Sequence, residues 1–358
     1  MKVALDTNHR YILQGGVSRY IDHLEAMLPK VDDRKELELE EIAWKVTNYE
    51  FAQPWRAMKT AYRELLWGKF QGPAEVRKKK CDLIHYLDFP FLDAPGCRQV
   101  MTLHDLGYIQ TPDRFRGWTR MRAKSRLART HLMDKVLCDS QFTADEAMSL
   151  LGLDSARIEV VYLGGGLSDP DAGIGAEKPD FEVPSEFLLY VGHLDPNKNL
   201  GLMKGIYDLA REKGKPLPPL LISGKPWEGV GEEMAPPPEW HFLGRQPDGV
   251  VRWLYEHAQI YLFTSRYEGF GLTVAESMNF GCPIVCSRNG SIPEVGGEAA
   301  CYAEQTPESF LEQILRLLSD SNLRDEVIAK GREQGAKFTW KRCATETLDV
   351  YRSVLQSG

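Results

Sequence analysis

The chain of 358 residues is 43% hydrophobic and 27% charged, and its formal net charge at pH 7 is −7. This length suffices for two globular domains, each with its own core. The acidic balance argues against a nucleic-acid binder, which would carry a basic domain. No apolar run approaches the roughly 20 residues of a membrane-spanning helix, and the first residues lack the layout of a signal peptide. We therefore expect a cytoplasmic protein.

The seven cysteines contain no C-x-x-C pair. Several lie in apolar runs, where a free thiol behaves as a small hydrophobic group. This usage is typical of a reducing compartment and does not favour a zinc site. Residues 1–175 hold 25 Lys and Arg against 25 Asp and Glu, so the whole charge deficit lies in the second half of the chain.

Lys2 to Leu5 is typical of a strand, and a polar loop after it ends in Gly15-Gly16. Two glycines before a helix can admit an anion or a substrate close to the backbone; a flexible strand-to-helix turn explains them equally well. The full fingerprint G-x-G-x-x-G is absent, which argues against an NAD-dependent oxidoreductase. The segment 32–80 gives no functional signal, and we interpret it as an acidic edge strand followed by a basic helix end.

The second of three closely spaced strands runs directly into His104 and Asp105. These strands are expected at 83–85, 100–103 and 135–138. Polar side chains at the carboxyl end of a parallel strand face the ligand crevice of an open sheet. A structural histidine is the alternative, but the adjacent acid and the strand end favour a functional role for His104.

Eight Lys and Arg residues lie between positions 114 and 135, where the only acid is Asp134. Trp118, Met121 and Leu132 add apolar side chains to the same stretch. This combination fits peripheral contact with an anionic membrane, on its cytoplasmic face, or with the lipid diphosphate of an acceptor. A solvated helix face is the alternative.

A run rich in Gly, Pro and Asp separates the two halves. Gly164 to Gly166 and then residues 168–185 lack apolar periodicity, which favours a linker. We expect a first domain at 1–167, a linker at 168–185, a second domain at 186–339 and a last helix at 340–358. Asp169-Pro-Asp171 has a metal-binding pattern, but no strand precedes it, and we interpret it as a turn.

The second sheet is expected to begin with a strand at 187–191, followed by the turn 192–199. This turn delivers Lys198 to the carboxyl end of the strand, where an ammonium can neutralise a phosphate. A solvated lysine is the alternative. Two similar strand-and-turn units follow at 220–224 and 241–245.

The stretch 260–286 predicts a strand, a glycine loop, a helix and a second strand. The loop 268–271 leads into the helix 272–280. Gly281 stands where a helix end needs a positive φ, and Pro283 prevents continuation. A helix N-terminus reached through a glycine loop can hold a phosphate by its unpaired N–H groups and its dipole.

Two carboxylates belong to this stretch, Glu268 in the loop and Glu276 inside the helix. They can accept hydrogen bonds from hydroxyls at different depths of one cleft. A diphosphate between two polyhydroxylated groups, as in a nucleotide-sugar, fits this set. A plain strand–helix connection with a solvated glutamate would explain a lone glycine pair, but not the two acids, two glycines, Gly281 and Pro283 together.

Glu268-Gly-Phe-Gly-Leu-x3-Glu276-x4-Gly281-x-Pro283 resembles the E-x7-E signature of the retaining glycosyltransferases of family 4. The resemblance extends over nearly the whole chain. It implies an α/β fold of the GT-B type, with two Rossmann-like, doubly wound parallel-sheet domains and a cleft between them. It also implies that the last helix crosses back onto the first domain.

The resemblance implies roles for individual residues. His104 matches a histidine that contacts the donor sugar, and Lys198 matches a cation that binds the diphosphate. The family usually has a second cation, an arginine, where this chain has His193, and we expect Arg266 to compensate. The expected catalytic residues are His104, Glu268 and Lys198. The expected donor contacts are Gly16, His193, Lys198, Arg245, Arg266, Gly269, Phe270, Gly271, Leu272 and Glu276, and the expected acceptor-side residues are Asp105 and Arg19.

These implications predict a retaining glycosyltransferase that moves a hexose, with mannose as the first candidate, to a hydroxyl of a glycan or lipid-linked acceptor. The donor would be a GDP- or UDP-linked sugar, and no metal or cofactor is expected. Glu268 would hold sugar hydroxyls and Glu276 the ribose hydroxyls. Two alternatives stay open: a nucleotide-sugar epimerase of the same fold, which needs no acceptor, and an inactive subunit that binds a nucleoside diphosphate without turnover.

Overall fold

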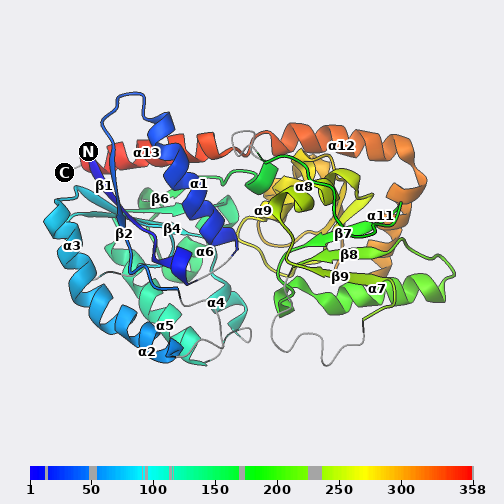
Figure 1. The fold of residues 1–358 in the computed structure, drawn as a ribbon, viewed down its shortest axis with the longest axis horizontal. Helices are drawn as coiled ribbons and strands as arrows, with labels where there is room; N and C mark the ends of the chain where they lie inside the picture. Colours follow the sequence, from blue (N-terminus) through cyan, green and yellow to red (C-terminus); the bar gives the residue numbers. More distant parts are fainter. Residues whose placement is uncertain are drawn as a thin grey trace. The chain divides into compact units, whose positions relative to one another are not determined.

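The computed structural model describes residues 1–12, 15–47, 55–90, 92, 96–112, 115, 117–168, 174–224 and 236–356 (Figure 1). The chain contacts divide it into two units. The first comprises residues 1–163 and 340–358, and the second comprises residues 164–339. The Asp169-Pro-Asp171 pattern and two cations of the basic stretch, Arg114 and Arg116, lie outside the described residues.

The first unit is built on a six-stranded sheet in the order β2-β1-β3-β4-β5-β6, and every pairing is parallel. Its strands are β1 (Lys2–Asp6), β2 (Glu38–Ile42), β3 (Leu83–Tyr86), β4 (Arg98–Leu103), β5 (Lys135–Cys138) and β6 (Ile158–Val160). The three inner strands expected after residue 80 are confirmed, and the acidic run ends in the edge strand β2.

Helices cover both faces of this sheet, because its strands are apolar on both sides. On one side α1 (Gly16–Val31) packs against α13 (Trp340–Gln356). On the other side Trp67 and Val76 share a core with alternate strand residues such as Ile84. The helices there are α2 (Arg56–Tyr62), the π-helix η2 (Arg63–Gln71), α3 (Gly72–Lys79), α5 (Gly117–Leu127) and α6 (Gln141–Leu151).

The second unit repeats the architecture with a parallel sheet in the order β12-β11-β10-β7-β8-β9. Its strands are β7 (Leu188–Val191), β8 (Leu220–Ser223), β9 (Trp240–Gly244), β10 (Ile260–Phe263), β11 (Ile284–Ser287) and β12 (Cys301–Ala303). The helices are α7 (Leu200–Glu212), α8 (Asp248–His257), α9 (Leu272–Asn279), α10 (Ile292–Gly296), α11 (Pro307–Ser319) and α12 (Ser321–Gly335).

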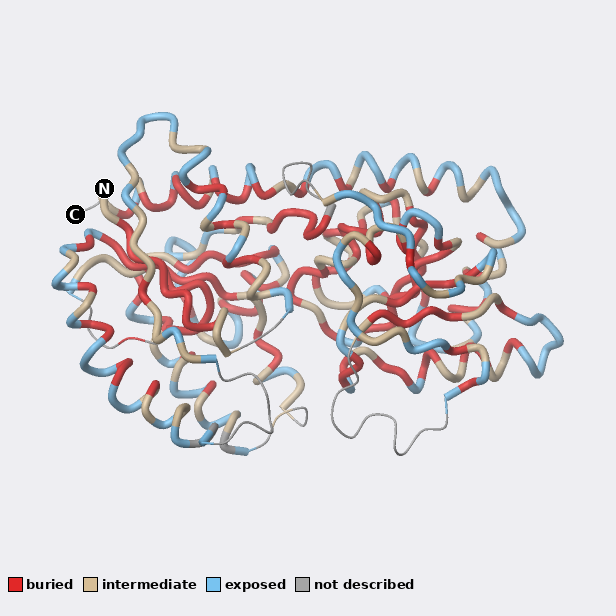
Figure 2. The backbone as a smooth tube through the Cα atoms, viewed as in Figure 1, coloured by how far each residue is buried: buried red, intermediate tan, exposed pale blue. Residues whose placement is uncertain are grey.

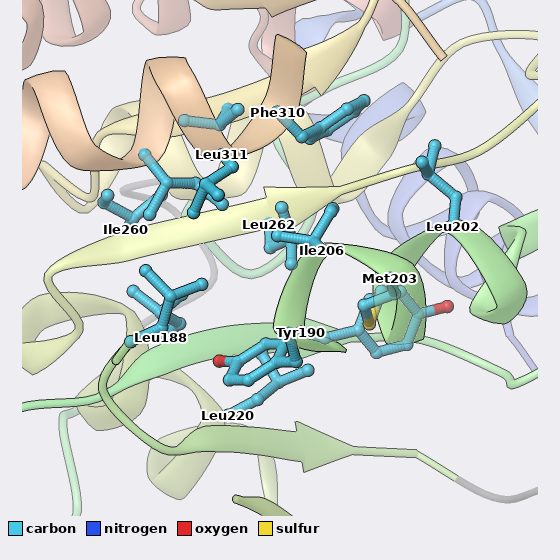
Figure 3. Packing of buried hydrophobic residues seen from close by; sticks show 14 of the residues in the cluster. Leu188, Tyr190, Leu202, Met203, Ile206, Leu220, Ile260, Leu262, Phe310 and Leu311 are labelled. Atoms are coloured by element: carbon cyan, nitrogen blue, oxygen red, sulfur yellow. The ribbon is translucent and has the colours of Figure 1, made fainter. Parts of the chain in front are cut away.

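The core of the second unit lies where α7 and α11 cover the inner strands. Ile206 of α7 and Phe310 of α11 pack on Leu262 of β10, and all three side chains are fully buried (Figure 3). Most residues of the inner strands of both units are buried (Figure 2). These continuous apolar strands are what a parallel sheet covered on both faces requires, so the predicted α/β fold with two doubly wound sheets is confirmed.

Each sheet reverses its strand order at its first strand. β1 lies between β2 and β3, and β7 lies between β8 and β10. At such a point the loops leave neighbouring strands in opposite directions, and the crevice between them is the usual ligand site of an open α/β sheet. We therefore expect the functional residues of the first unit in the loops after β1 and β3, and those of the second unit in the loops after β7 and β10.

A buried chain of hydrogen bonds fixes α13 and α1 on the first sheet. His85 of β3 contacts the Tyr351 hydroxyl through Nδ1 at 2.6 Å and the Thr102 hydroxyl through Nε2 at 2.8 Å. The Tyr20 hydroxyl of α1 lies 2.8 Å from the same Thr102 oxygen. Burial lowers the pKa of His85 to about 3, so its ring stays neutral at pH 7.

Replacing Tyr351 with phenylalanine should lower the free energy of unfolding by about 1–3 kcal/mol, because a buried ring nitrogen of His85 loses its partner. The measurement is the urea midpoint, compared with Tyr62→Phe. The Tyr62 hydroxyl donates to Gln71 in an exposed position, so that variant should change stability by less than about 0.5 kcal/mol. Equal midpoints for the two variants would contradict a structural role for this network.

Candidate functional site

The turn after β7 holds Lys198 in a defined position. Residues 196–198 form one 3-10 turn, and the Asp195 side chain caps it by accepting from the Asn197 backbone N–H. Asn199 adopts the left-handed conformation before α7 begins. Because Asn tolerates this conformation, the chain can turn sharply there, and Lys198 is left at the carboxyl edge of the sheet.

The loop after β10 is bonded directly to this turn. The Thr264 hydroxyl donates to the Lys198 carbonyl at 2.7 Å, and the Arg266 N–H donates to the Asn197 carbonyl at 2.9 Å. The Asn197 side-chain amide in turn donates to the Tyr267 carbonyl at 2.5 Å. These bonds join the two loops that flank the reversal of strand order in the second sheet.

Lys198 and Glu268 meet at this junction. Lys198 Nζ lies 2.6 Å from Glu268 Oε1, and the two side chains are 18% and 17% exposed. The ammonium also lies 5.6 Å from the centre of the Phe263 ring. The predicted convergence of Lys198 and Glu268 is therefore present, although they are 70 residues apart in the chain. A largely buried cation beside a carboxylate can bind a phosphate and a hydroxyl together.

The helix expected after this loop begins at Leu272, next to the ion pair. Gly271 has a φ of 93°, and a Cβ atom there would approach Ile292 Cδ1 to 2.7 Å. Only glycine fits both demands without strain. The first N–H groups of a helix have no intrahelical partner, so the start of α9 offers donors on the same edge as Lys198. Gly281, with a φ of 75°, ends the helix as predicted.

Glu276 lies deeper than the sequence suggested, because its side chain is fully buried. Its Oε1 accepts from the Leu167 backbone N–H at 2.9 Å, and its Oε2 accepts from the Tyr255 hydroxyl at 3.2 Å. A Cβ at Gly166 would lie 2.0 Å from Oε1. The glycine run interpreted as a domain boundary thus has a second role, which is to let the backbone approach this carboxylate.

The other expected donor residues lie at the same sheet edge with different exposure. His193, Arg245 and Arg266 are exposed. Arg266 Nη2 donates to the Asn199 side chain at 2.9 Å, so this guanidinium lies on the turn that carries Lys198. Gly269 is buried, and Leu272 is half-buried. The Phe270 ring is buried against Phe338, with ring centres 5.4 Å apart, so only its backbone is available to a ligand.

In the first unit His104 follows β4 and is held by two acceptors. Its Nδ1 lies 2.6 Å from Asp139 Oδ2, and its Nε2 lies 2.9 Å from the Leu87 carbonyl oxygen. Both acceptors lack a proton to give, so the ring must donate from both nitrogens, which only the imidazolium form does. Burial opposes this charge, but Asp139 prevails and raises the pKa of His104 to about 9.

Asp139 was not identified from the sequence. It follows β5, which pairs with β4, and only this pairing brings it to His104 across 35 positions of the chain. Its carboxyl is buried, and its Oδ1 has no hydrogen-bond partner among the described residues. The signal in the sequence was an acid directly after a buried strand, the same signal that was used for His104.

A second buried pair occupies the strand-order reversal of the first sheet. His9, after β1, lies 3.3 Å from the Asp88 carboxylate, after β3. Burial lowers the pKa of His9 to about 4 and raises the pKa of Asp6 to about 6. Asp6 Oδ1 accepts from the backbone N–H and the side chain of Asn8. From the sequence, this segment is typical only of a polar loop.

The remaining expected residues lie around the same edge of the first unit. Gly16 is exposed at the start of α1, and Arg19 is half-buried one turn later. The Asp105 carboxylate accepts from the Gly107 N–H at 2.8 Å and so begins a short helix. Within the basic stretch, Arg122 and Arg126 are not solvated cations, because both pair with Glu64.

Among the described residues, no three His, Cys, Asp or Glu side chains gather as a metal site would require. The same part of the chain contains no helix with the length and apolar character needed to cross a bilayer.

Two family models together cover most of the chain. The model described as Glycosyl transferases group 1 matches residues 176–334, and the model described as Glycosyltransferase Family 4 matches residues 14–164. The two matches correspond closely to the two structural units.

Two of the curated relatives are named as mannosyltransferases. The chain is 30% identical over 268 residues to an O-antigen chain mannosyltransferase B from Escherichia coli, a match that covers 71% of this chain and 70% of the relative. It is 25% identical to the serotype-specific mannosyltransferase WbdA of Escherichia coli over 73% of this chain. The match covers only 34% of that longer protein.

Solved structures share the fold over the whole chain. Sucrose-phosphate synthase from Thermosynechococcus elongatus superposes with a TM-score of 0.70 at 18% identity, covering all of both chains. HepE from Anabaena, in complex with UDP and glucose, gives a TM-score of 0.68 at 17% identity, covering 99% of this chain and all of the other.

An Asp139→Asn substitution should lower the pKa of His104, because it removes the charge that opposes the effect of burial. The measurement is a titration of the labelled histidine ring by NMR, with a value near 9 expected in the wild type. The stability that this raised pKa provides should be complete below about pH 6.5 and disappear as the pH rises through about 9.

Asp145→Asn is the matched control, since Asp145 is an exposed residue of α6 that accepts from Gln141. A His104 that titrates below pH 7 in the wild type, or that titrates unchanged in Asp139→Asn, would contradict the assigned charge.

Proposed function

Because the chain belongs to glycosyltransferase family 4, we propose that it transfers mannose from a nucleoside-diphosphate sugar, GDP-mannose as the first candidate, with retention at the anomeric carbon. The acceptor is a hydroxyl of a glycan or of a lipid-linked glycan. Mannose is supported by the mannosyltransferase relatives. The UDP bound by a structural neighbour keeps uridine donors as the second choice.

The observation that carries this proposal is the Lys198–Glu268 contact at 2.6 Å beside the start of α9. One cation, a set of helix N–H groups and one carboxylate meet where the strand order reverses. Phosphate oxygens need the first two, and sugar hydroxyls donate to the third. A pyrophosphate bonded to a sugar presents both kinds of group to one site.

In the proposed reaction the barrier is the departure of the nucleoside diphosphate. Lys198 and the N-terminus of α9 stabilise the charge that develops on the leaving oxygen, which is the largest single contribution in many enzymes. The acceptor hydroxyl attacks from the face that the diphosphate leaves, and the departing phosphate takes its proton. Such a route stabilises the leaving group without a metal ion.

His104 contributes a fixed positive charge to the proposed mechanism. An imidazolium that donates from both nitrogens has no lone pair to accept a proton, so it cannot act as a general base. Contact with a sugar hydroxyl requires Nε2 to release the Leu87 carbonyl, 2.9 Å away, while Asp139 keeps the ring oriented. His104 thus helps to position the sugar and favours negative charge nearby.

The remaining donor contacts are those that the family resemblance implies. Arg266, on the Lys198 turn, supplies the second cation in place of the arginine that His193 replaces. Arg245 and the Gly244 turn line the nucleotide base, and Gly16 approaches the diphosphate. Glu276 accepts from the ribose hydroxyls, which requires the Leu167 N–H to release its carboxylate, because Glu276 is fully buried here.

The proposal also includes the compartment in which the protein works and its contact with a membrane. The protein works in the cytoplasm, on the side of the membrane where nucleotide-sugars are made available to it. The basic stretch 114–135 contacts anionic lipid through its exposed cations, which exclude Arg122 and Arg126 because these pair with Glu64.

The direct test is a transfer assay with GDP-mannose, UDP-glucose and UDP-N-acetylglucosamine and a mannose-terminated glycan acceptor. We expect turnover with GDP-mannose, an α-linked product by NMR, and an unchanged rate in the presence of EDTA. A β-linked product would contradict retention, and loss of turnover with EDTA would contradict metal independence. Donor conversion without acceptor would indicate the epimerase, and nucleotide binding without turnover would indicate the inactive subunit.

Lys198→Met should lower kcat/KM about 10- to 100-fold, since a hydrogen bond to a charged group contributes about 1.5–3 kcal/mol. Glu268→Gln should have an effect of similar size through the sugar hydroxyls. Lys204→Met is the matched control, because Lys204 pairs with Asp208 on the surface of the adjoining helix α7. Equal activity of the Lys198→Met and Lys204→Met variants would contradict the assignment of Lys198 to the site.

A further inference from the structure

Large apolar side chains are exposed mainly in one part of the first unit. Of the ten described residues of this kind, seven belong to two segments, 55–71 and 121–132. They are Trp55, Met58, Leu65, Leu66, Phe70, Met121 and Leu132. We call these seven residues the apolar face. Single exposed apolar residues are ordinary on a protein surface, but a group of this size indicates a contact.

The helical segment 55–71 carries most of the residues of the apolar face. It runs from α2 into the π-helix η2, where Gly72 N–H bonds to the Trp67 carbonyl five residues earlier. Arg63 and Trp67 point into the core and are buried. The wider turn leaves both Leu65 and Leu66 on the outside, and Phe70 beside them is 64% exposed.

Helix α5 lies beside this segment, as the shared partner Glu64 shows. Arg126 Nη2 lies 2.5 Å from Glu64 Oε1, and Arg122 pairs with the same oxygen. These arginines fill the seam between the helices, so the neighbouring Met121 turns outward and is 69% exposed. The two segments therefore form one surface, whose helices are drawn next to each other in Figure 1.

Both segments that carry the apolar face contain more Lys and Arg than acids, although Arg63 is buried and Arg122 and Arg126 pair with Glu64. Residues 55–80 contain eight Lys and Arg against two Glu, and residues 117–135 contain six against one Asp. The chain as a whole has a net charge of −7. Lys69, Arg120 and Lys124 are exposed next to the apolar residues. The excess is thus local and coincides with the exposed apolar side chains.

We propose that the apolar face with its basic border docks on an anionic lipid bilayer, with helix 55–71 lying in the headgroup region. A helix that combines large apolar side chains with Lys and Arg binds the interface by apolar burial and by attraction to acidic lipids. A second copy of the chain fits poorly, because it would bring two strongly basic surfaces together. This inference extends the lipid contact proposed above for 114–135 and shifts its centre to a segment without a functional signal in the sequence.

The test measures binding to vesicles and uses neither donor nor acceptor, so its outcome is separate from that of the transfer assay. The wild type should sediment with vesicles of phosphatidylcholine containing about 30% phosphatidylglycerol, less with phosphatidylcholine alone, and less in high salt. The triple variant Met58→Gln, Leu65→Gln, Phe70→Gln should bind at least roughly tenfold more weakly. Leu150→Gln, an exposed leucine of α6 in the same unit, should bind as the wild type does.

The contribution of the basic residues is tested by the double variant Lys69→Gln, Lys124→Gln. This variant should bind anionic vesicles more weakly, by roughly fivefold per cation removed. Lys213→Gln with Lys215→Gln, two exposed lysines of the second unit, is the matched control and should have no effect. Trp55 is 70% exposed, and brominated lipids should quench its fluorescence. The contribution of Trp55 is the difference between the fluorescence of the wild type and that of the Trp55→Phe variant.

Three results would overturn the proposal: no binding of the folded wild type to anionic vesicles at low salt, equal binding by the triple variant, or Trp55 fluorescence insensitive to brominated lipid. A dimer that the triple variant converts to a monomer, with no vesicle binding by either, would assign the face to a second copy. Release of vesicle-bound protein by an acidic protein alone, without salt dependence, would assign it to a protein partner.

Discussion

The ion pair between Lys198 and Glu268 is the contact on which the second unit's chemistry depends. It joins the loops after β7 and β10, two strands that are neighbours only because the sheet order reverses at β7. A hydrogen bond from the Thr264 hydroxyl and one from the Arg266 backbone N–H hold the same two loops together. The cation, the carboxylate and the start of α9 therefore keep their places without a ligand, and a site that is already organised does not have to be ordered when the donor binds.

In the first unit, strand order also brings distant residues together at the carboxyl edge of the sheet, but there the pairs are histidines with aspartates. Its carboxyl edge holds His104 and Asp139 on adjacent strands, and His9 and Asp88 on the two sides of the reversal. Asp139 keeps His104 charged despite burial, whereas His9 stays neutral beside Asp88, because burial dominates there. Two histidines at one sheet edge thus differ in charge at neutral pH: His104 is positively charged and His9 is neutral. Only His104 can act as a fixed cation.

The sequence predicted the features that local patterns determine. Apolar periodicity located the strands, and glycines marked the turns at Gly271 and Gly281, both of which have positive φ. It could not predict pairings that arise from strand order, such as Asp139 with His104. The burial of Glu276 depends on a close approach by Gly166, 110 positions earlier, which no local pattern records. Segment 55–71 was also missed, because a π-helical turn does not follow the 3.6-residue period by which helices were recognised.

The central claim is that the Lys198–Glu268 edge binds a nucleoside diphosphate. Thermal unfolding in the presence of GDP, UDP and ADP tests it most directly, since a ligand at 100 times its Kd adds about 2.7 kcal/mol of stability. The account predicts that one of the first two nucleotides raises the Tm of the wild type and that Lys198→Met loses most of this gain while Lys204→Met keeps it. No stabilisation by any diphosphate, or an equal gain in Lys198→Met, would contradict the claim.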